Sequence, residues 1–167
     1  VLADTNATEL RGDGQLGAGV ERIRLARGDD AEALRVSGEH DGYLRRYRRL
    51  HRRSLALARS GRRLEGRDEI LPGPRRPRST IPFDIRFHLH PDVVASQTGG
   101  GRTILLRLGN RHGWMFEADA GSVALEESLF FDREGPRRSQ QIVIHGEAGP
   151  ELVGIAWRFE RQGSGGG

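Results

Sequence analysis

Arginine, tyrosine and histidine side chains gather in one polar stretch of the sequence, residues 43–53. If this stretch is extended, alternate residues project from a single face. Guanidinium groups on such a face match the paired oxygens of carboxylates and sulfates. We therefore predict a binding face for an anionic polymer, either an acidic polysaccharide or nucleic acid. Its candidate substrate-binding residues are Arg45, Tyr47, Arg49, His51 and Arg53.

The same arginines also have a plain structural explanation. All 27 basic residues are arginine and no lysine occurs, so any solvated sheet face of this protein carries arginine. The formal net charge of +4 favours an anionic partner only weakly. Both interpretations stay open at this point. A nucleic-acid binder is disfavoured, because the sequence has no recognisable reading motif.

Two histidines have a spacing that metal sites use. His88 and His90 are two residues apart, so on a strand both imidazoles leave one face about 6.6 Å apart along the chain. Zinc needs further ligands, and the sequence offers no evident third one. We therefore predict no metal site, with His88 and His90 as weak candidates, and no cofactor in this chain. The plainer interpretation is a polar strand face shared with Asp84 and Arg86.

No arrangement of residues predicts catalysis by this chain alone. Neighbouring carboxylates such as Glu126 and Glu127 point to opposite faces of a strand, so they do not form an acid–base couple. Nucleophile elbows, phosphate-binding loops, dinucleotide fingerprints and His-Glu-x-x-His helices are absent from the sequence. Cysteine is also absent, which excludes disulfides and thiolate metal sites.

Alternating apolar and polar residues predict many short strands and no amphipathic helix. The clearest strand is 81–90, where Phe83, Ile85 and Phe87 share an apolar face. In the last strand Trp157 falls on the apolar side, so we expect it in the core. The remaining predicted strands are 20–27, 33–40, 43–50, 54–58, 64–69, 102–108, 113–118, 122–131, 140–145 and 152–161.

These strands, with 24 glycines for turns, predict an all-β fold, namely an antiparallel two-layer β-sandwich. We expect one domain over residues 1–161, with 1–19 as an irregular arm and 162–167 as a disordered Gly/Ser tail. No apolar run approaches the length of a membrane span. The start at Val1, with neither Met nor signal peptide, suggests a fragment of a longer protein.

Several short motifs, in this order and spacing, resemble the carboxy-terminal region of heparinase II/III-like proteins. They begin with Val-Leu-Ala-Asp-Thr-Asn at 1–6, and the resemblance covers residues 1 to about 161. The others are His-Asp-Gly-Tyr at 40–43, His-Arg-Arg at 51–53, Leu-Glu-Gly-Arg-Asp at 64–68, Arg-Phe-His-Leu-His-Pro at 86–91, Gly-Trp at 113–114, Leu-Glu-Glu-Ser at 125–128 and Gln-Gln-Ile-Val at 140–143.

The resemblance implies a two-part polysaccharide lyase, an α/α toroid followed by a β-sandwich, that breaks uronic-acid links by β-elimination. In the family the catalytic residues lie in the toroid, and zinc ligands lie upstream of the region matched here. We therefore carry over no catalytic residue and no metal ligand, and expect this piece to be inactive alone. In the full-length parent protein, the resemblance is compatible with a zinc site. The implied partners are an acidic polysaccharide and the missing toroid, in the periplasm or alternatively the cytoplasm. The alternative function is a non-catalytic carbohydrate-binding sandwich that uses the arginine-rich face.

Overall fold

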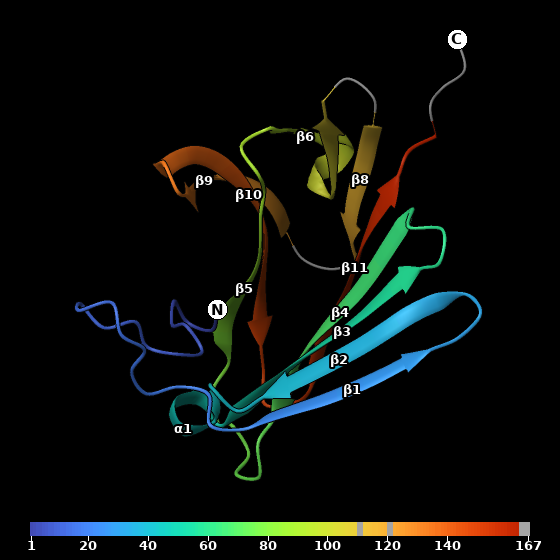
Figure 1. Ribbon diagram of the computed structural model, residues 1–167. Coiled ribbons are helices and arrows are strands. Elements are labelled where there is room, and N and C mark those ends of the chain that lie inside the picture. The colour runs from blue at the N-terminus through green and yellow to red at the C-terminus, as the bar shows by residue number, and fades with distance from the viewer. Residues whose placement is uncertain (110–111, 120–121, 164–167) are drawn as a thin grey trace.

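In the computed structural model, which describes residues 1–109, 112–119 and 122–163, the chain forms two antiparallel β-sheets (Figure 1). The predicted all-β sandwich is therefore confirmed. The larger sheet consists, in spatial order, of β1 (Ile23–Asp29), β2 (Ala33–His40), β3 (Arg49–Ala58), β4 (Arg63–Pro72), β11 (Val153–Arg161), β8 (His112–Ala118), β7 (Thr103–Leu108) and β6 (Val93–Thr98). The smaller sheet consists of β5 (Ile81–His88), β10 (Gly135–Ala148) and β9 (Ser122–Asp132).

The core lies between the two sheets and is built from one face of each strand. On β5 the predicted division is confirmed, since Phe83 and Ile85 are buried while His88 is exposed. Trp157 is 5% exposed and packs edge-on against Phe87 with 4.7 Å between ring centroids. Burying a large apolar side chain contributes about 1.5–3 kcal/mol, so these residues hold the two layers together.

The small sheet covers only part of the inner face of the large one. The register places Ile23 opposite His40, and Leu25 two residues further along on the same face of β1. Ile23 is 65% exposed and Leu25 is 74% exposed. Figure 1 shows the hairpin end of β1 and β2 projecting away from β5 and β10. We call the uncovered apolar residues the open apolar face; they are Ile23, Leu25, Leu34, Val36 and Leu57.

The predicted strand over residues 43–50 is wrong for 43–48, while Arg49 and Leu50 belong to β3. The chain instead forms one helical turn, α1 (Leu44–Tyr47), closed by hydrogen bonds from the Tyr47 amide to the Tyr43 carbonyl and from the Arg48 amide to the Leu44 carbonyl. Arg48 then adopts the left-handed conformation, with φ at 59°, and β3 begins at Arg49. The error arose because polar residues that alternate carry no information about burial.

Other strand bounds differ less from the prediction. β2 has the predicted bounds, while β3 starts five residues before the predicted Ser54. β6 was not predicted, because its sequence Val-Val-Ala-Ser-Gln-Thr alternates poorly. A short 3₁₀ turn, η1 (Gly99–Gly101), follows β6. The helices among the described residues are too short and polar to span a membrane.

The predicted irregular arm contains a segment that belongs to the small sheet. Leu2 bridges Phe83 of β5 in antiparallel sense and is almost fully buried. The Ala3 amide donates to the Pro82 carbonyl, and the Asp84 amide donates to the Val1 carbonyl. Residues 1–3 therefore lie along the edge of β5 that β10 leaves free. Of the predicted tail, residues 164–167 lie outside the described part of the chain.

Candidate functional site

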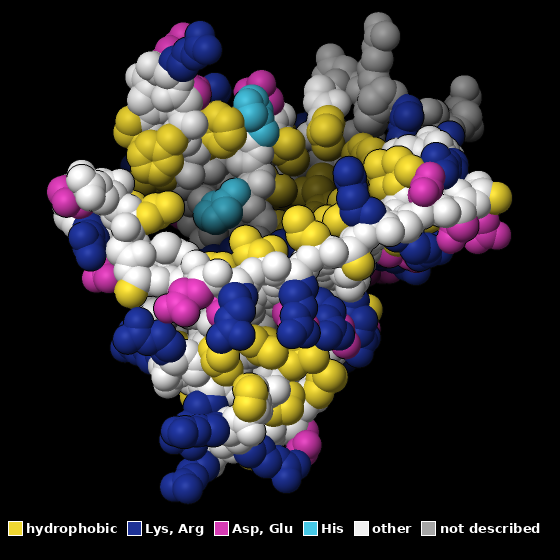
Figure 2. Space-filling view, turned by 60° about the horizontal axis from the view of Figure 1, so that its bottom comes forward, with side chains coloured by type: hydrophobic (Ala, Val, Ile, Leu, Met, Phe, Trp, Pro, Cys, Tyr) yellow, Lys and Arg dark blue, Asp and Glu magenta, His cyan; other side chains and the backbone are white. Residues whose placement is uncertain are grey.

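A cavity of about 310 Å³ lies between the inner face of β3 and β4 and the free edge of β5. Its polar lining comes from both layers. The antiparallel register of the large sheet sets His40 beside His51 and Arg53 beside Asp68, and β5 of the small sheet adds Asp84, Arg86 and His88. Figure 2 shows histidine and apolar side chains together in a hollow of the surface. The polar and aromatic side chains that line the cavity are His40, Tyr43, His51, Arg53, Asp68, Asp84, Arg86 and His88.

Asp68 is the centre of the hydrogen-bond network in this cavity. Its side chain is 2% exposed, and it accepts hydrogen bonds from His51 Nε2 at 2.7 Å and Arg53 Nε at 2.8 Å. Trp157 Nε1 donates a third at 2.7 Å. Burial alone would raise the pKa of Asp68, but these donors outweigh it and lower the pKa below its ordinary value. We call Asp68, His51, His40, Arg53 and Trp157 the Asp68 cluster.

The two histidines of the Asp68 cluster form a chain in which every ring nitrogen is engaged. The Gly42 amide donates to His40 Nδ1 at 3.2 Å, so His40 must carry its proton on Nε2. That proton is donated to His51 Nδ1 over 3.1 Å, which leaves His51 Nε2–H to donate to Asp68. The network is thus satisfied with both rings neutral. Burial lowers the pKa of His40, and the neighbouring His51 lowers it further.

Arg53 is the member of the Asp68 cluster that retains binding capacity. Its Nε is used by Asp68, while within the described residues its two terminal nitrogens have no hydrogen-bond partner. The guanidinium lies 5.5 Å from the ring centroid of Phe87 and 5.6 Å from that of Trp157, a cation–π geometry. Its side chain is 37% exposed. It can therefore meet a carboxylate or sulfate that enters the cavity.

The structure divides the five predicted substrate-binding residues among three places. Arg45 and Tyr47 lie on α1, whereas His51 and Arg53 belong to the Asp68 cluster. Arg49 lies between these groups and is fully buried. The predicted single strand face is wrong, because the helical turn and the left-handed Arg48 separate the first two residues from β3. Polysaccharide binding by these side chains stays a prediction.

Arg49 has a structural role. Its Nη1 donates to the Gly149 carbonyl at 2.6 Å, and its Nη2 donates to the carbonyls of Ser79 and Ala148, each at 2.9 Å. A guanidinium has several donors in a fixed fork, so one side chain can satisfy three backbone acceptors. Arg49 thereby joins β3 to the end of β10 and to the loop before β5.

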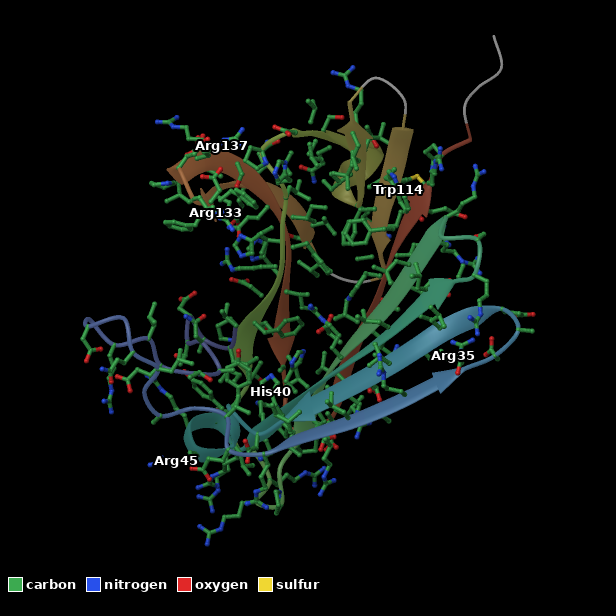
Figure 3. The ribbon with its side chains drawn as sticks, viewed as in Figure 1. Arg35, His40, Arg45, Trp114, Arg133 and Arg137 are labelled. Carbon is green, nitrogen blue, oxygen red and sulfur yellow. The ribbon has the colours of Figure 1, made fainter. Side chains whose placement is uncertain are left out.

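The side chains on α1 border a second, larger groove of about 700 Å³, whose other wall is the amino-terminal arm. Tyr47 Oη lies 2.7 Å from Thr5 Oγ1, and the Arg46 guanidinium lies 5.5 Å from the Tyr47 ring centroid. Arg45 and Arg46 are exposed. Figure 3 shows Arg45 beyond α1, on the side away from the sheets, and His40 nearer to the sheets. This groove presents two arginines and a tyrosine to solvent.

The histidine pair considered for a metal does not converge. His88 Nδ1 lies 2.9 Å from Ser128 Oγ, while His90 lies beyond the end of β5 and packs against the Phe130 ring. Within residues 1–109, 112–119 and 122–163, no group of three or more possible ligands could hold a metal ion.

Sequence reasoning missed the partners of the predicted residues. Asp68 and His40 were not singled out, although both lie in the short motifs 64–68 and 40–43. A second ion-pair cluster on the outer face of the small sheet was also missed; there His145 Nδ1 lies 2.7 Å from Asp84, and Arg86 pairs with Asp84 and Glu126. Only the strand register brings these residues together, and register is not readable from single strands.

Comparison with known proteins gives a family and a fold. A family model described as heparinase II/III-like, C-terminal matches residues 1–163. FtsZ-localized protein C of Caulobacter vibrioides (strain NA1000 / CB15N) is 33% identical over 153 residues, which is 86% of this chain and 26% of that protein.

Among solved structures, the heparan sulfate lyase HepC of Pedobacter heparinus superposes with a TM-score of 0.71 at 10% identity, over 87% of this chain and 22% of that one. A mutant of the same lyase gives a TM-score of 0.68 over 84% of this chain. This likeness shows the fold. The chain spans about a quarter of the length of these proteins, and it belongs to the heparinase II/III-like family, whose carboxy-terminal domain it represents.

Proposed function

We propose that this chain is the non-catalytic sheet domain of a polysaccharide lyase-like protein, and that it supports the part that carries out β-elimination. That reaction needs a free base at the C5 proton of a uronate and a group that neutralises its carboxylate. The cavity offers Arg53 for the second task. For the free base, the observation that supports the proposal is that both histidines of the Asp68 cluster already use each ring nitrogen in a hydrogen bond.

The test is an elimination assay on the purified chain. Heparan sulfate and alginate are incubated with the chain, and the ultraviolet absorbance of the unsaturated uronate product is followed. We expect no product, with the heparan sulfate lyase HepC as the positive control on heparan sulfate. Product that disappears in a His51→Ala variant, while tryptophan fluorescence shows a folded chain, would contradict the proposal.

A second candidate function is recognition of an anionic polysaccharide at the α1 groove. The specific observation is that Arg45 and Arg46 are exposed side by side, with Tyr47 beneath the Arg46 guanidinium. Guanidinium forks bind carboxylate and sulfate oxygens in pairs, and an aromatic ring offers a flat surface to a sugar. The expected ligand is a short uronate oligomer.

Calorimetric titration with uronate oligomers tests this candidate. Loss of binding is expected in an Arg45→Ala/Arg46→Ala variant. The matched control is Arg133→Ala/Arg138→Ala, which removes the same charge from exposed positions on the β9–β10 hairpin. Figure 3 shows Arg133 far from Arg45. Equal loss in both variants would indicate a general charge effect and would eliminate the groove as the site.

A further inference from the structure

We propose that a second run of arginines extends the α1 groove into a longer binding surface for an acidic polysaccharide chain. This run lies in the loop between β4 and β5, at residues 75–78. The inference rests on the second candidate function, which it extends from a short oligomer to a long chain. We call the exposed arginines in and directly after α1, together with those of the loop, the arginine patch; they are Arg45, Arg46, Arg48, Arg75, Arg76 and Arg78.

The loop between β4 and β5 lies directly against α1, although the two arginine runs are about thirty residues apart in the sequence. The Gly73 amide donates to the Arg48 carbonyl at 2.8 Å. A Cβ at Gly73 would stand 2.5 Å from Leu44 Cδ1 and 3.0 Å from the Arg48 carbonyl oxygen, so glycine allows this close approach. Figure 1 shows the loop and α1 at the same end of the molecule. The fold therefore joins the two runs into one surface.

The loop is also held in a defined conformation. Its far end is fixed by Arg49, whose Nη2 donates to the Ser79 carbonyl at 2.9 Å. Pro72, Pro74 and Pro77 restrict the backbone between these two anchors. Pro77 is buried, whereas the arginines on either side of it are exposed. A surface that is already ordered loses less conformational entropy when it binds a partner.

The positive charge of the chain is concentrated in the arginine patch. The patch holds six arginines, whereas the formal net charge of the entire chain is +4. Within the described residues, Arg76 is the only one of the six with an ion-pair partner, which is Glu151. On the outer face of the large sheet, by contrast, Arg24 and Arg52 both pair with Glu39. An anionic partner would therefore meet mostly unpaired guanidinium groups at the patch.

The surroundings of the arginine patch favour a sugar polymer over a lipid surface or nucleic acid. In the described part of the chain, no exposed large apolar side chain lies on α1 or on residues 73–80, so the patch lacks an apolar anchor for a bilayer. α1 has four residues and is too short to read a DNA groove. The adjoining groove instead offers hydroxyl and amide groups of Thr5, Asn6 and Thr8 to the hydroxyl groups of a sugar.

The test is a calorimetric titration with long alginate chains, long heparin chains and a short uronate oligomer. Arg75→Ala/Arg78→Ala removes two exposed arginines of the loop, and the matched control Arg133→Ala/Arg138→Ala removes the same charge from the β9–β10 hairpin. The loop variant should lose about tenfold or more in affinity for long chains, because charge-assisted contacts are lost. Its affinity for the short oligomer should not change. Loss for both polymers would identify carboxylate as the recognised anion, and loss for heparin alone would identify sulfate.

Salt dependence separates direct contacts from a change in net charge. For linear polyanions such as nucleic acids, each anionic group that a basic side chain neutralises contributes about 0.7–0.9 to the slope of log affinity against log salt. The slope for long chains should therefore be smaller by about one or more in Arg75→Ala/Arg78→Ala and unchanged in the control. Both variants replace exposed side chains, so their urea midpoints should equal that of the unmodified chain.

Several outcomes would overturn the proposal. One is that long chains fail to bind the unmodified chain, or bind Arg75→Ala/Arg78→Ala equally well. Another is an equal loss of affinity in the loop variant and the control. Anionic vesicles or duplex DNA that bind more tightly than either polysaccharide, and lose that binding in the loop variant, would identify a different partner. Loss of oligomer binding in Arg45→Ala/Arg46→Ala would still support the α1 groove, and the elimination assay does not involve the loop, so each proposal fails independently.

Discussion

Replacing Arg49 with methionine tests whether a buried guanidinium joins the two layers. Methionine fills a similar volume but donates no hydrogen bond, so the carbonyls of Ser79, Ala148 and Gly149 lose their partner. The Ala148 carbonyl is buried together with the Arg49 side chain, while the other two lie in partly buried surroundings. The variant therefore leaves one acceptor without water and two that water can partly reach.

The magnitude follows from these three acceptors. A buried acceptor left unsatisfied costs about 1–3 kcal/mol, and a partly solvated one costs roughly 1 kcal/mol. Removing the buried charge works in the opposite direction, because burial lowers the pKa of Arg49 and no carboxylate in the described part of the chain pairs with it. We expect Arg49→Met to reduce the free energy of unfolding by about 3–4 kcal/mol.

Urea unfolding followed by tryptophan fluorescence measures this change as a shift in midpoint at constant slope. The control is Arg52→Met on the opposite face of β3, where Arg52 pairs with Glu39 and Glu69 near the surface. Exposed ion pairs contribute about 0–1 kcal/mol, so the control should shift the midpoint little. Equal midpoints for both variants would refute the view that Arg49 joins β3 to β10.

Three further predictions concern the Asp68 cluster and its surroundings. Gly66→Ala should destabilise the fold by about 3 kcal/mol or more, because a Cβ there would collide with the Trp157 ring. In the control Gly28→Ala the added Cβ has no atom within 4 Å, so urea unfolding should show no change for this variant. Asp68→Asn should reduce the free energy of unfolding by about 3–5 kcal/mol, because it leaves buried donors without a carboxylate; an unchanged urea midpoint would contradict the network. In the unmodified chain, the stabilisation by Asp68 is present above pH about 4 and is lost as the pH falls through the lowered pKa of Asp68. Because the pKa of His40 is lowered in the folded state, the unfolded chain binds a proton more readily, and stability should fall as the pH drops below 6.5. Urea titrations at several pH values should show a smaller pH dependence of stability in His40→Gln.

The sequence was informative wherever one face of a strand was apolar. The strand at 81–88 was predicted with its correct faces, and Trp157 was placed in the core, because both depend on period-2 alternation against a buried layer. The same reasoning failed at 43–48, where each face of an imagined strand was mostly polar. There the local backbone hydrogen bonds of α1 decided the conformation.

The Asp68 cluster could not be predicted, because its members come from β2, β3, β4 and β11. Asp68 meets Arg53 only through the β3–β4 register, and Trp157 only because β11 pairs with the far edge of β4. That last neighbour is distant in sequence, since β11 follows β4 after some eighty residues. The half-covered state of the large sheet also depends on which strands pair, and alternation alone does not reveal it.

Within the described residues β5 keeps a free edge at Arg86 and His88, beside a half-covered sheet, and amide exchange along β5 in the unmodified chain tests this most directly. Ile85 and Phe87 should exchange slowly because they pair with β10, and Asp84 should be protected by Val1. Arg86 and His88 should exchange fast, giving an alternating pattern. Slow exchange at both Arg86 and His88 in dilute solution would show that the edge is already covered, and would contradict the account.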